Sequence, residues 1–252
     1  MFRGVPMLVN RVASFASTIG NGLSRALLPP TCCLCGRLAP AFLAGAEPDL
    51  DLCEVCLNLF PLDGAPNADV NADVNADASP PASFARTLVR TRVSFQYAYP
   101  VDHMIRALKF RGERVYARVL GTLLAQQVRA LRQPAPHRIV PIPLHAERYR
   151  ERGFNQAQEI ARFAAKGLSI PLDTRCLERT VATLEQSGLT LAQRRRNVRD
   201  AFFVRRVPHV QRVALVDDVL TTGSTALAAA KALLDAGVPE VELWAVARVT
   251  LD

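Results

Sequence analysis

The sequence predicts an α/β fold: a mostly parallel sheet with flanking helices, preceded by a small cysteine-rich module. From residue 84 onward, short apolar runs typical of buried strands alternate with amphipathic helical patterns, which indicates parallel strands joined by helices. Before Leu62 the chain carries five of its six cysteines. With 252 residues, half of them hydrophobic, the chain is long enough for one fair-sized core plus a small appendage.

The elements of the sheet region follow in order from their periodicity. Strands are expected at 91–99, 137–144, 212–219 and 240–249, and helices at 101–110, 114–131, 155–167 and 224–237. Gly167 and Gly237 are the expected stops of the last two helices. In parallel sheets of this kind ligands sit at the carboxyl ends of the strands. The residues after the strands that end near 144 and 219 are therefore the places to look for a site.

The chain divides into three parts. Residues 1–62 are expected to hold an N-terminal helix and the cysteine module, and residues 84–252 the sheet. Residues 63–83 include the repeat "NADVNADVNADASPPAS", which has too little apolar content to bury and reads as a disordered linker. The first 30 residues are weakly amphipathic and favour a helix packed on the protein over a secretion signal. No apolar run approaches the ~20 residues that a membrane span needs.

The net charge of +8 is unevenly distributed. Residues 84–252 contain 27 basic and 15 acidic residues, a net charge of +12, whereas residues 1–83 carry a net charge of −4. A basic main domain suits phosphates or nucleic acid, although a solvated basic surface accounts for the excess equally well.

A pair of acids stands at the end of a strand-like run. Residues 213–216 are typical of a buried parallel strand, and Asp217 and Asp218 mark the rim where that strand emerges, because carboxylates are costly to bury. The loop that follows is rich in hydroxyls and contains Gly223, and a helix begins near Ser224. Free amides at a helix N-terminus, together with hydroxyls, form a phosphate cradle.

Two carboxylates beside a phosphate cradle would repel a bare phosphate chain, so they are expected to bind another part of the same ligand. They can accept hydrogen bonds from adjacent sugar hydroxyls, or attract a Mg²⁺ ion that is also held by ligand phosphates. A ribose with a 5′-phosphate offers hydroxyls to the carboxylates and a phosphate to the cradle. Neither the G-x-x-x-x-G-K-[ST] nor the G-x-G-x-x-G phosphate motif occurs in the sequence. An N-capped helix after a polar turn would explain Thr222 or Ser224 alone, but not the paired acids.

The segment "VALVDDVLTTGSTA" resembles the phosphoribosyl pyrophosphate (PRPP) motif of type I phosphoribosyltransferases. The resemblance implies that Asp217 and Asp218 contact the ribose hydroxyls, as ligand-binding and catalytic groups. It also implies a phosphate-binding loop formed by Thr221, Thr222, Gly223, Ser224 and Thr225.

A second segment adds basic residues near the end of another predicted strand. Arg148, Arg150 and Arg152 crowd the chain just before Gly153. On a helix they would form a solvated face, whereas on a loop beside the cradle they could bind a pyrophosphate, for which Arg152 is the candidate. The cluster Arg194, Arg195, Arg196 and Arg199 suits phosphates or single-stranded nucleic acid.

The cysteines form two C-x-x-C pairs, Cys32 with Cys35 and Cys53 with Cys56. With 17 residues between the inner members, two such knuckles can place four thiolates tetrahedrally around Zn²⁺. The metal would be fully coordinated and structural. Cys33 offers a second-ranked alternative ligand, a disulfide is disfavoured without a secretion signal, and Cys176 reads as a small buried hydrophobe.

Taken in order, several segments resemble the ComF family, also called the ComF/GntX family. They are "PPTCCLCG", "LCEVC", "LKFRGE", "VPIPLH", "RERGFNQ", "RRRNVRDAF" and "VDDVLTTGST". The resemblance implies a zinc ribbon joined to a phosphoribosyltransferase-like domain. It also implies PRPP bound with Mg²⁺, a cytoplasmic location, and a role in DNA uptake during natural transformation, with single-stranded DNA and DNA-uptake proteins as partners.

Two functional hypotheses remain open. The first is a PRPP-binding protein of DNA uptake, and the second is a nucleotide-salvage enzyme that transfers phosphoribose to a base. A base pocket would separate them, with Phe95, Tyr97 or Tyr99 as candidate aromatic residues. An aromatic strand face is more often core than pocket. A PRPP-sensing transcriptional regulator ranks last, because no helix-turn-helix segment is recognisable.

Overall fold

A computed structural model of the chain describes residues 31–37, 50–63, 88–180 and 201–249. The predicted N-terminal helix within residues 1–30, most of the predicted linker and the arginine cluster at 194–199 lie outside these residues. The chain forms two compact units, Met1–Asn58 and Leu59–Asp252, which are described separately below.

The second unit is built on a four-stranded parallel sheet. Its strands are β1 (Leu88–Gln96), β2 (Arg138–Pro141), β5 (Arg212–Leu220) and β6 (Glu240–Arg248), in the order β1-β6-β5-β2. All three neighbouring pairs run parallel. The fold class predicted from the alternating pattern is therefore confirmed, and each predicted strand occurs, with shifted ends.

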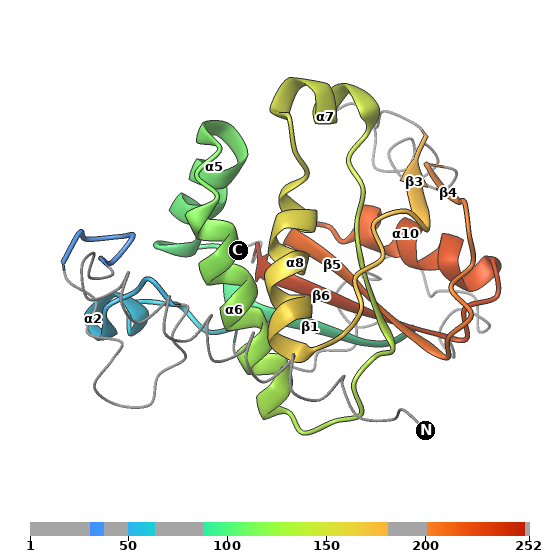
Figure 1. The fold of residues 1–252 in the computed structure, drawn as a ribbon, viewed down its shortest axis with the longest axis horizontal. Coiled ribbons are helices and arrows are strands. Elements are labelled where there is room, and N and C mark those ends of the chain that lie inside the picture. Colours follow the sequence, from blue (N-terminus) through green and yellow to red (C-terminus); the bar gives the residue numbers. More distant parts are fainter. Residues whose placement is uncertain (1–30, 38–49, 64–87, 181–200, 250–252) are drawn as a thin grey trace, which may run out of the picture. The chain divides into compact units, whose positions relative to one another are not determined.

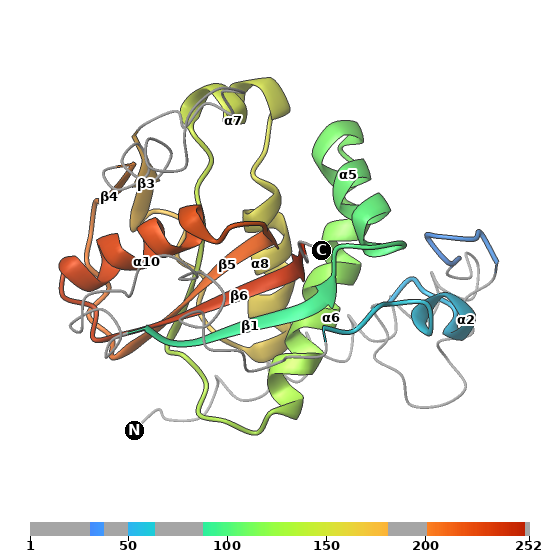
Figure 2. The ribbon, with the colours of Figure 1, turned by 180° about the vertical axis from the view of Figure 1, so that it is seen from behind.

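Helices cover both faces of this sheet. On one face α6 (Val115–Ala130) packs against β1 and β6, and α8 (Gln156–Leu168) packs against β2 and β5. On the opposite face lies α10 (Ser224–Asp235), which Figure 1 shows behind the sheet and Figure 2 in front of it. The short helix α5 (Val101–Arg111) precedes α6, and α7 (Ala146–Arg152) precedes α8.

The contact between α6 and α8 depends on small residues. A Cβ atom at Gly121 would lie 2.4 Å from the Ile160 carbonyl oxygen, and one at Gly167 would lie 2.9 Å from the Ala125 Cβ. The prediction that Gly167 ends its helix is therefore wrong, because α8 continues to Leu168 and closes at Ser169, which has φ +58°. Gly167 allows the close approach of two helices, which a sequence cannot distinguish from a stop signal. The predicted end near Gly237 is confirmed, since α10 stops at Asp235.

A two-stranded antiparallel ribbon, β3 (Leu177–Arg179) with β4 (Phe202–Val204), completes the α10 side. Its residues join β5, β6 and α10 in one hydrophobic cluster that includes Cys176 and Phe202. Cys176 is fully buried, as predicted, and this burial raises the pKa of its thiol to about 12. Among the described residues, no helix is long and apolar enough to cross a membrane.

Candidate functional site

The candidate site begins where β2 separates from β5. Pro141 is the last residue of β2 in register with β5, opposite Val216, and the Ile142 amide donates to the Val216 carbonyl at 2.9 Å. Beyond that point β5 continues alongside β6, up to the pair Leu220 and Arg248. Asp217 and Asp218 are thus the first residues of β5 past the end of β2. The prediction that they mark the rim where the strand emerges is wrong in part, because β5 continues to Leu220 and Asp218 is buried, where Lys109 pairs with its carboxylate.

The two acids project from opposite faces of the sheet, because successive side chains of a strand alternate. Val213 and Leu215 belong to the cluster around α10, so Asp217 continues that face. Asp218 continues the other face, where its Oδ2 atom lies 2.5 Å from Nζ of Lys109, a residue of α5. Asp218 is only 3% exposed, whereas Asp217 is partly accessible.

The electrostatic surroundings of the two acids differ. Burial, followed by the charge of Asp218, raises the pKa of Asp217 well above its ordinary value, and an amide hydrogen bond from Asp218 to Asp217 Oδ1 at 2.9 Å opposes this rise. Burial lowers the pKa of Arg179, and the charge of Asp217 works against that lowering. Asp217 is thus close enough to Arg179 for their charges to interact. The Lys109 ammonium group pairs with Asp218 and its charge also acts on Asp217, which interacts with Arg179 as well.

The loop after β5 leads through Gly223 into the N-terminus of α10. Gly223 has φ +69°, a left-handed conformation that favours glycine, and it directs the chain into α10. Thr221 and Thr222 are exposed, Ser224 and Thr225 are partly exposed, and the Thr222 and Ser224 hydroxyls lie 3.0 Å apart. The amide of Leu227 donates to the Gly223 carbonyl, so the amides before it form the positive start of the helix. The fold thus brings the predicted loop residues together beside the acids.

Arg152 lies near the acids, although its segment is helical. The structure places Arg148, Arg150 and Arg152 on α7, which confirms the helical alternative, with Arg148 and Arg150 exposed. Arg152 is half-buried at the last position of α7, where its NH1 atom donates to Gln156 Oε1 at 2.6 Å. Burial lowers the pKa of Arg152, and the charge of Asp218 counters this. Arg152 therefore faces Asp218 from the end of a helix.

Asn155 ties this segment to the sheet. Its side-chain amide donates to the Ile142 carbonyl at 2.9 Å, and its Oδ1 atom accepts from the Ala157 amide at the start of α8. This one buried residue caps a helix and also fixes the exit of β2. The position of Arg152 relative to the acids is set by this anchor.

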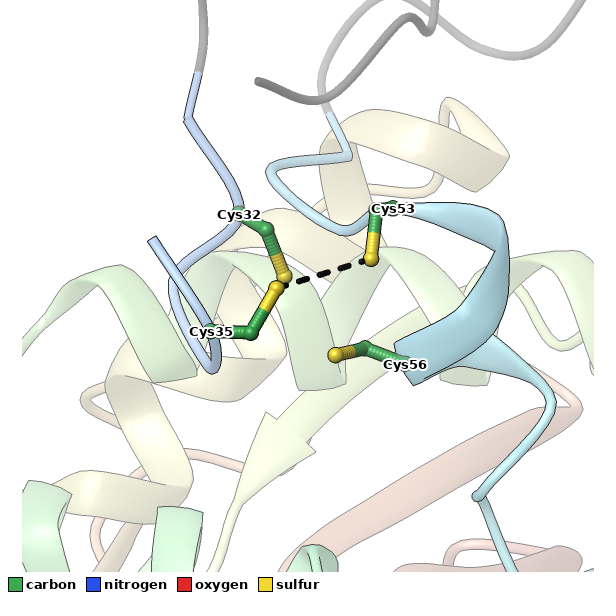
Figure 3. A group of neighbouring side chains, drawn as sticks. All are labelled: Cys32, Cys35, Cys53 and Cys56. Atoms are coloured by element: carbon green, nitrogen blue, oxygen red, sulfur yellow. Dashed lines mark hydrogen bonds between the residues drawn. The ribbon is translucent and has the colours of Figure 1, made fainter. Parts of the chain in front are cut away.

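The first unit brings four cysteines together. The ligand atoms of Cys32, Cys35, Cys53 and Cys56 all lie within 4.8 Å of one another, and Figure 3 shows them converging from two segments. The sulfur atoms of Cys35 and Cys53 are 3.7 Å apart. Cys33 is not part of this group, so the predicted set of four is the one that the fold assembles.

Backbone geometry shapes each half of this cluster. In the first knuckle the Gly36 amide donates to the Cys32 carbonyl at 2.8 Å, with Gly36 at φ +72°. In the second, Cys53 precedes the short helix α2 (Glu54–Leu57), which contains Cys56. Burial acts to raise the pKa of the Cys32 thiol, but hydrogen bonds from backbone amides outweigh it and hold that pKa at about 6. Four thiols that converge in this way fit the tetrahedral all-sulfur environment that zinc prefers.

Comparison with known proteins places the chain in a family. It is 36% identical over 160 residues to "Competence protein F" of Haemophilus influenzae, an alignment that covers 60% of this chain and 69% of the relative. The chain belongs to the ComF family. Two further relatives of this ComF-family protein are "DNA utilization protein YhgH" of Escherichia coli K12, 35% identical, and "Competence protein ComFC" of Streptococcus pneumoniae, 27% identical. These alignments cover 60% and 62% of this chain and 69% and 67% of the relatives. No family model matches the chain.

The structure also corrects the candidate aromatic residues. Phe95 is buried and packs edge-on against Phe60, with ring centroids 5.1 Å apart, so it belongs to the core and is not a pocket residue. Tyr97 is partly exposed, and Tyr99 is exposed on the surface beside His103. Phe110, which follows Lys109 on α5 of this ComF-family chain, is an exposed aromatic residue whose ring centroid lies 5.8 Å from the Arg152 guanidinium carbon.

Two functional candidates, Lys109 and Arg179, were not among the predicted site residues, although Lys109 lies in the family-like segment "LKFRGE". Both lie far from Asp217 and Asp218 along the chain, so only the fold reveals the contacts. One signal was present for the neighbouring Phe110. It falls outside the apolar stripe formed by Val101, Met104, Ile105 and Leu108, and a large apolar side chain off the stripe of an amphipathic helix often contacts something other than the core.

Proposed function

We propose that this ComF-family chain binds PRPP, or a related ribose 5-phosphate ligand, together with Mg²⁺ at the carboxyl end of β5. The observation that carries the proposal is the acid pair near the end of β5, which is followed after Leu220 by exposed threonines, the left-handed Gly223 and the start of α10. In this assignment the 5′-phosphate accepts hydrogen bonds from the amides and hydroxyls of residues 221–225. Asp217 and Asp218 accept hydrogen bonds from the ribose hydroxyls.

The polarity of the surroundings supports a ligand that is both polyhydroxylated and anionic. Lys109, Arg152 and Arg179 lie around the two carboxylates, so the immediate environment carries an excess of positive charge. A pyrophosphate group would supply the compensating negative charge, and Mg²⁺ bound with it would reduce its repulsion from the Asp217 carboxyl group, whose pKa is raised.

The biological setting of the proposal is DNA uptake and utilisation, in the cytoplasm. The names "Competence protein F", "DNA utilization protein YhgH" and "Competence protein ComFC" describe relatives, and their agreement supports a related role for this chain. The exposed face of α7, with Arg148, Tyr149 and Arg150, has the mixture of cations and aromatic rings that binds single-stranded nucleic acid. We propose single-stranded DNA and DNA-uptake proteins as its partners.

The cysteine cluster supports a structural role for Zn²⁺. Cys32, Cys35, Cys53 and Cys56 would hold the ion with four thiolates, which leaves no position for a substrate or water. The ion would stabilise the small unit that the two knuckles form, because such short segments bury little apolar surface by themselves.

A second candidate is phosphoribosyl transfer to a base, with pyrophosphate as the other product. One observation favours it, namely the exposed ring of Phe110 beside Lys109, which offers a face for a planar base. In such a reaction the cations would stabilise the departing pyrophosphate, and the carboxylates would orient the ribose as positive charge develops on it.

Calorimetric titration of the full chain with PRPP and Mg²⁺ tests the proposal. Binding should be lost in the variant that combines Asp217→Asn with Asp218→Asn, because both acceptors for the ribose hydroxyls are changed. The matched control is Asp235→Asn, an exposed acid near the other end of α10 that pairs with Lys231. Affinity retained in the double variant would contradict the site. Release of pyrophosphate with a panel of bases would then favour the transferase over the binding protein.

A further inference from the structure

The contact between Lys109 and Asp218 raises a question about the free protein. If Asp218 binds a ribose hydroxyl, its carboxylate must be available, yet its Oδ2 atom lies 2.5 Å from the Lys109 ammonium group. The Asp218 side chain is 5% exposed, so solvent does little to stabilise its charge. The ion pair therefore occupies the group that the proposed ligand needs.

The backbone of Lys109 is held firmly, but the end of its side chain is not. Lys109 belongs to the last turn of α5, whose residues Met104, Ile105 and Leu108 are completely buried, and Gly112 ends the helix with φ +68°. The Lys109 side chain is partly exposed at the edge of this packing. A lysine ammonium on a four-carbon stem can change partners while its helix stays in place.

The cations on this face outnumber the acids. Lys109 and Arg152 both act on Asp218, and the Arg152 guanidinium is further held over the ring of Phe110. A sugar hydroxyl that donates to Asp218 would stabilise its carboxylate but add no charge, which would leave the ammonium group free to pair with another anion. In PRPP the nearest anion to the ribose hydroxyls, apart from the 5′-phosphate, is the pyrophosphate on C1.

We propose that Lys109 changes partners on ligand binding. In the free protein its ammonium group pairs with the Asp218 carboxylate, and in the complex it moves to the pyrophosphate of bound PRPP. This inference rests on the proposed function and adds a binding residue that the PRPP motif does not contain. Lys109 holds the buried carboxylate of Asp218 until the ligand arrives, and it then contributes to recognition of the pyrophosphate, the group that ribose 5-phosphate lacks.

Two ligands separate this exchange from a fixed structural ion pair. PRPP with Mg²⁺ and ribose 5-phosphate share the sugar and the 5′-phosphate, but only PRPP carries pyrophosphate. In Lys109→Met the affinity for PRPP should fall by about tenfold or more, whereas the affinity for ribose 5-phosphate should stay the same or rise. Lys109→Arg should recover most of the PRPP affinity, and Lys231→Met, which removes an exposed lysine of α10, should change neither.

Two outcomes would overturn the exchange. An equal loss for both ligands in Lys109→Met would mean that Lys109 only supports Asp218, and an unchanged PRPP affinity would mean that it does not meet the pyrophosphate. If the unaltered protein bound neither ligand, the proposed function itself would fail, and the inference with it. If Lys109→Met does not fold, Lys109→Gln can replace it, because its amide can still donate to Asp218. This variant should likewise lose affinity for PRPP and keep its affinity for ribose 5-phosphate.

A thermal double-mutant cycle tests the free state independently. Lys109→Met leaves a buried carboxylate without its ammonium partner, so it should lower the unfolding temperature, and adding Asp218→Asn should reverse part of that loss. Strictly additive shifts would overturn the proposal, because Lys109 would not then be holding Asp218 in the free protein.

Discussion

Asp217 and Asp218 are adjacent in the chain, and although strand geometry directs their side chains to opposite faces of the sheet, the charge of Lys109 acts on both. Asp218 pairs directly with Lys109 of α5, and the charge of Asp217 also acts on Arg179 of β3. A ligand held by both acids would therefore have to lie across the end of β5, where β2 has already separated from it. This arrangement requires the ligand to approach from the carboxyl edge of the sheet.

The raised pKa of Asp217 predicts how stability depends on pH. An acid whose pKa is raised by folding binds its proton more tightly in the native state, so the stability of the fold falls as pH rises from the unfolded pKa to the folded one. Asp217→Asn should therefore raise the unfolding temperature at about pH 7.5, and the gain should shrink toward about pH 4. Asp235→Asn is the control, and an equal gain at both pH values would contradict the assignment.

Gly223 should be needed for ligand binding more than for folding. Replacement by alanine forces a side chain into a left-handed conformation, at a cost of about 1 kcal/mol, and should distort the loop that precedes α10. Gly237→Ala is a matched control, because that glycine also has positive φ and lies just after the other end of α10. Denaturant unfolding should show similar losses in the free energy of unfolding for the two variants. Titration with PRPP should show a loss of affinity for Gly223→Ala and none for Gly237→Ala. Equal affinities would mean that the loop does not hold the phosphate.

The sulfur cluster predicts which thiols retain a metal. Metal analysis of the purified protein should find one zinc ion per chain, and Cys53→Ser should lose it, because one of the four converging ligands is removed. Cys33→Ser is the control, since Cys33 lies in the same knuckle but outside the cluster. Loss of zinc from Cys33→Ser with retention in Cys53→Ser would reverse the ligand assignment.

The α6–α8 contact predicts a large effect from a small substitution. Gly121→Ala places a methyl group against the Ile160 carbonyl, with no flexible side chain to yield, so the two helices must separate. We expect a loss of about 1–3 kcal/mol in the free energy of unfolding, typical of overpacked interiors. Urea denaturation measures it, and a stability equal to that of the unaltered protein would show that the helices are not so closely packed.

Much of the fold was predictable because its elements are locally encoded. The apolar run at 213–216 predicts a buried strand, and the alanine-rich segment after Ser224 predicts a helix. The acids were predicted near the carboxyl end of this strand, but their cost of burial did not place them in solvent, because Asp218 is buried beside Lys109. The four cysteine ligands were predictable from spacing alone, and the fold gathers the same four.

What could not be predicted depends on contacts between distant segments. Gly167 resembles a helix stop in sequence, and only the approach of Ala125 reveals its packing role. Phe95 was a candidate for a pocket until its contact with Phe60 placed it in the core. Lys109 and Asp218 lie on α5 and β5, far apart in the chain, and no local pattern indicates their pairing.

The position of the ligand's 5′-phosphate in a crystal structure grown with PRPP and Mg²⁺ is the most direct test of the account. We predict that this phosphate lies at the start of α10, within hydrogen-bonding distance of the amides of residues 222–225, with the ribose hydroxyls turned toward Asp217 and Asp218. A sugar phosphate bound elsewhere on the chain, with this loop and the acids left without ligand, would contradict it.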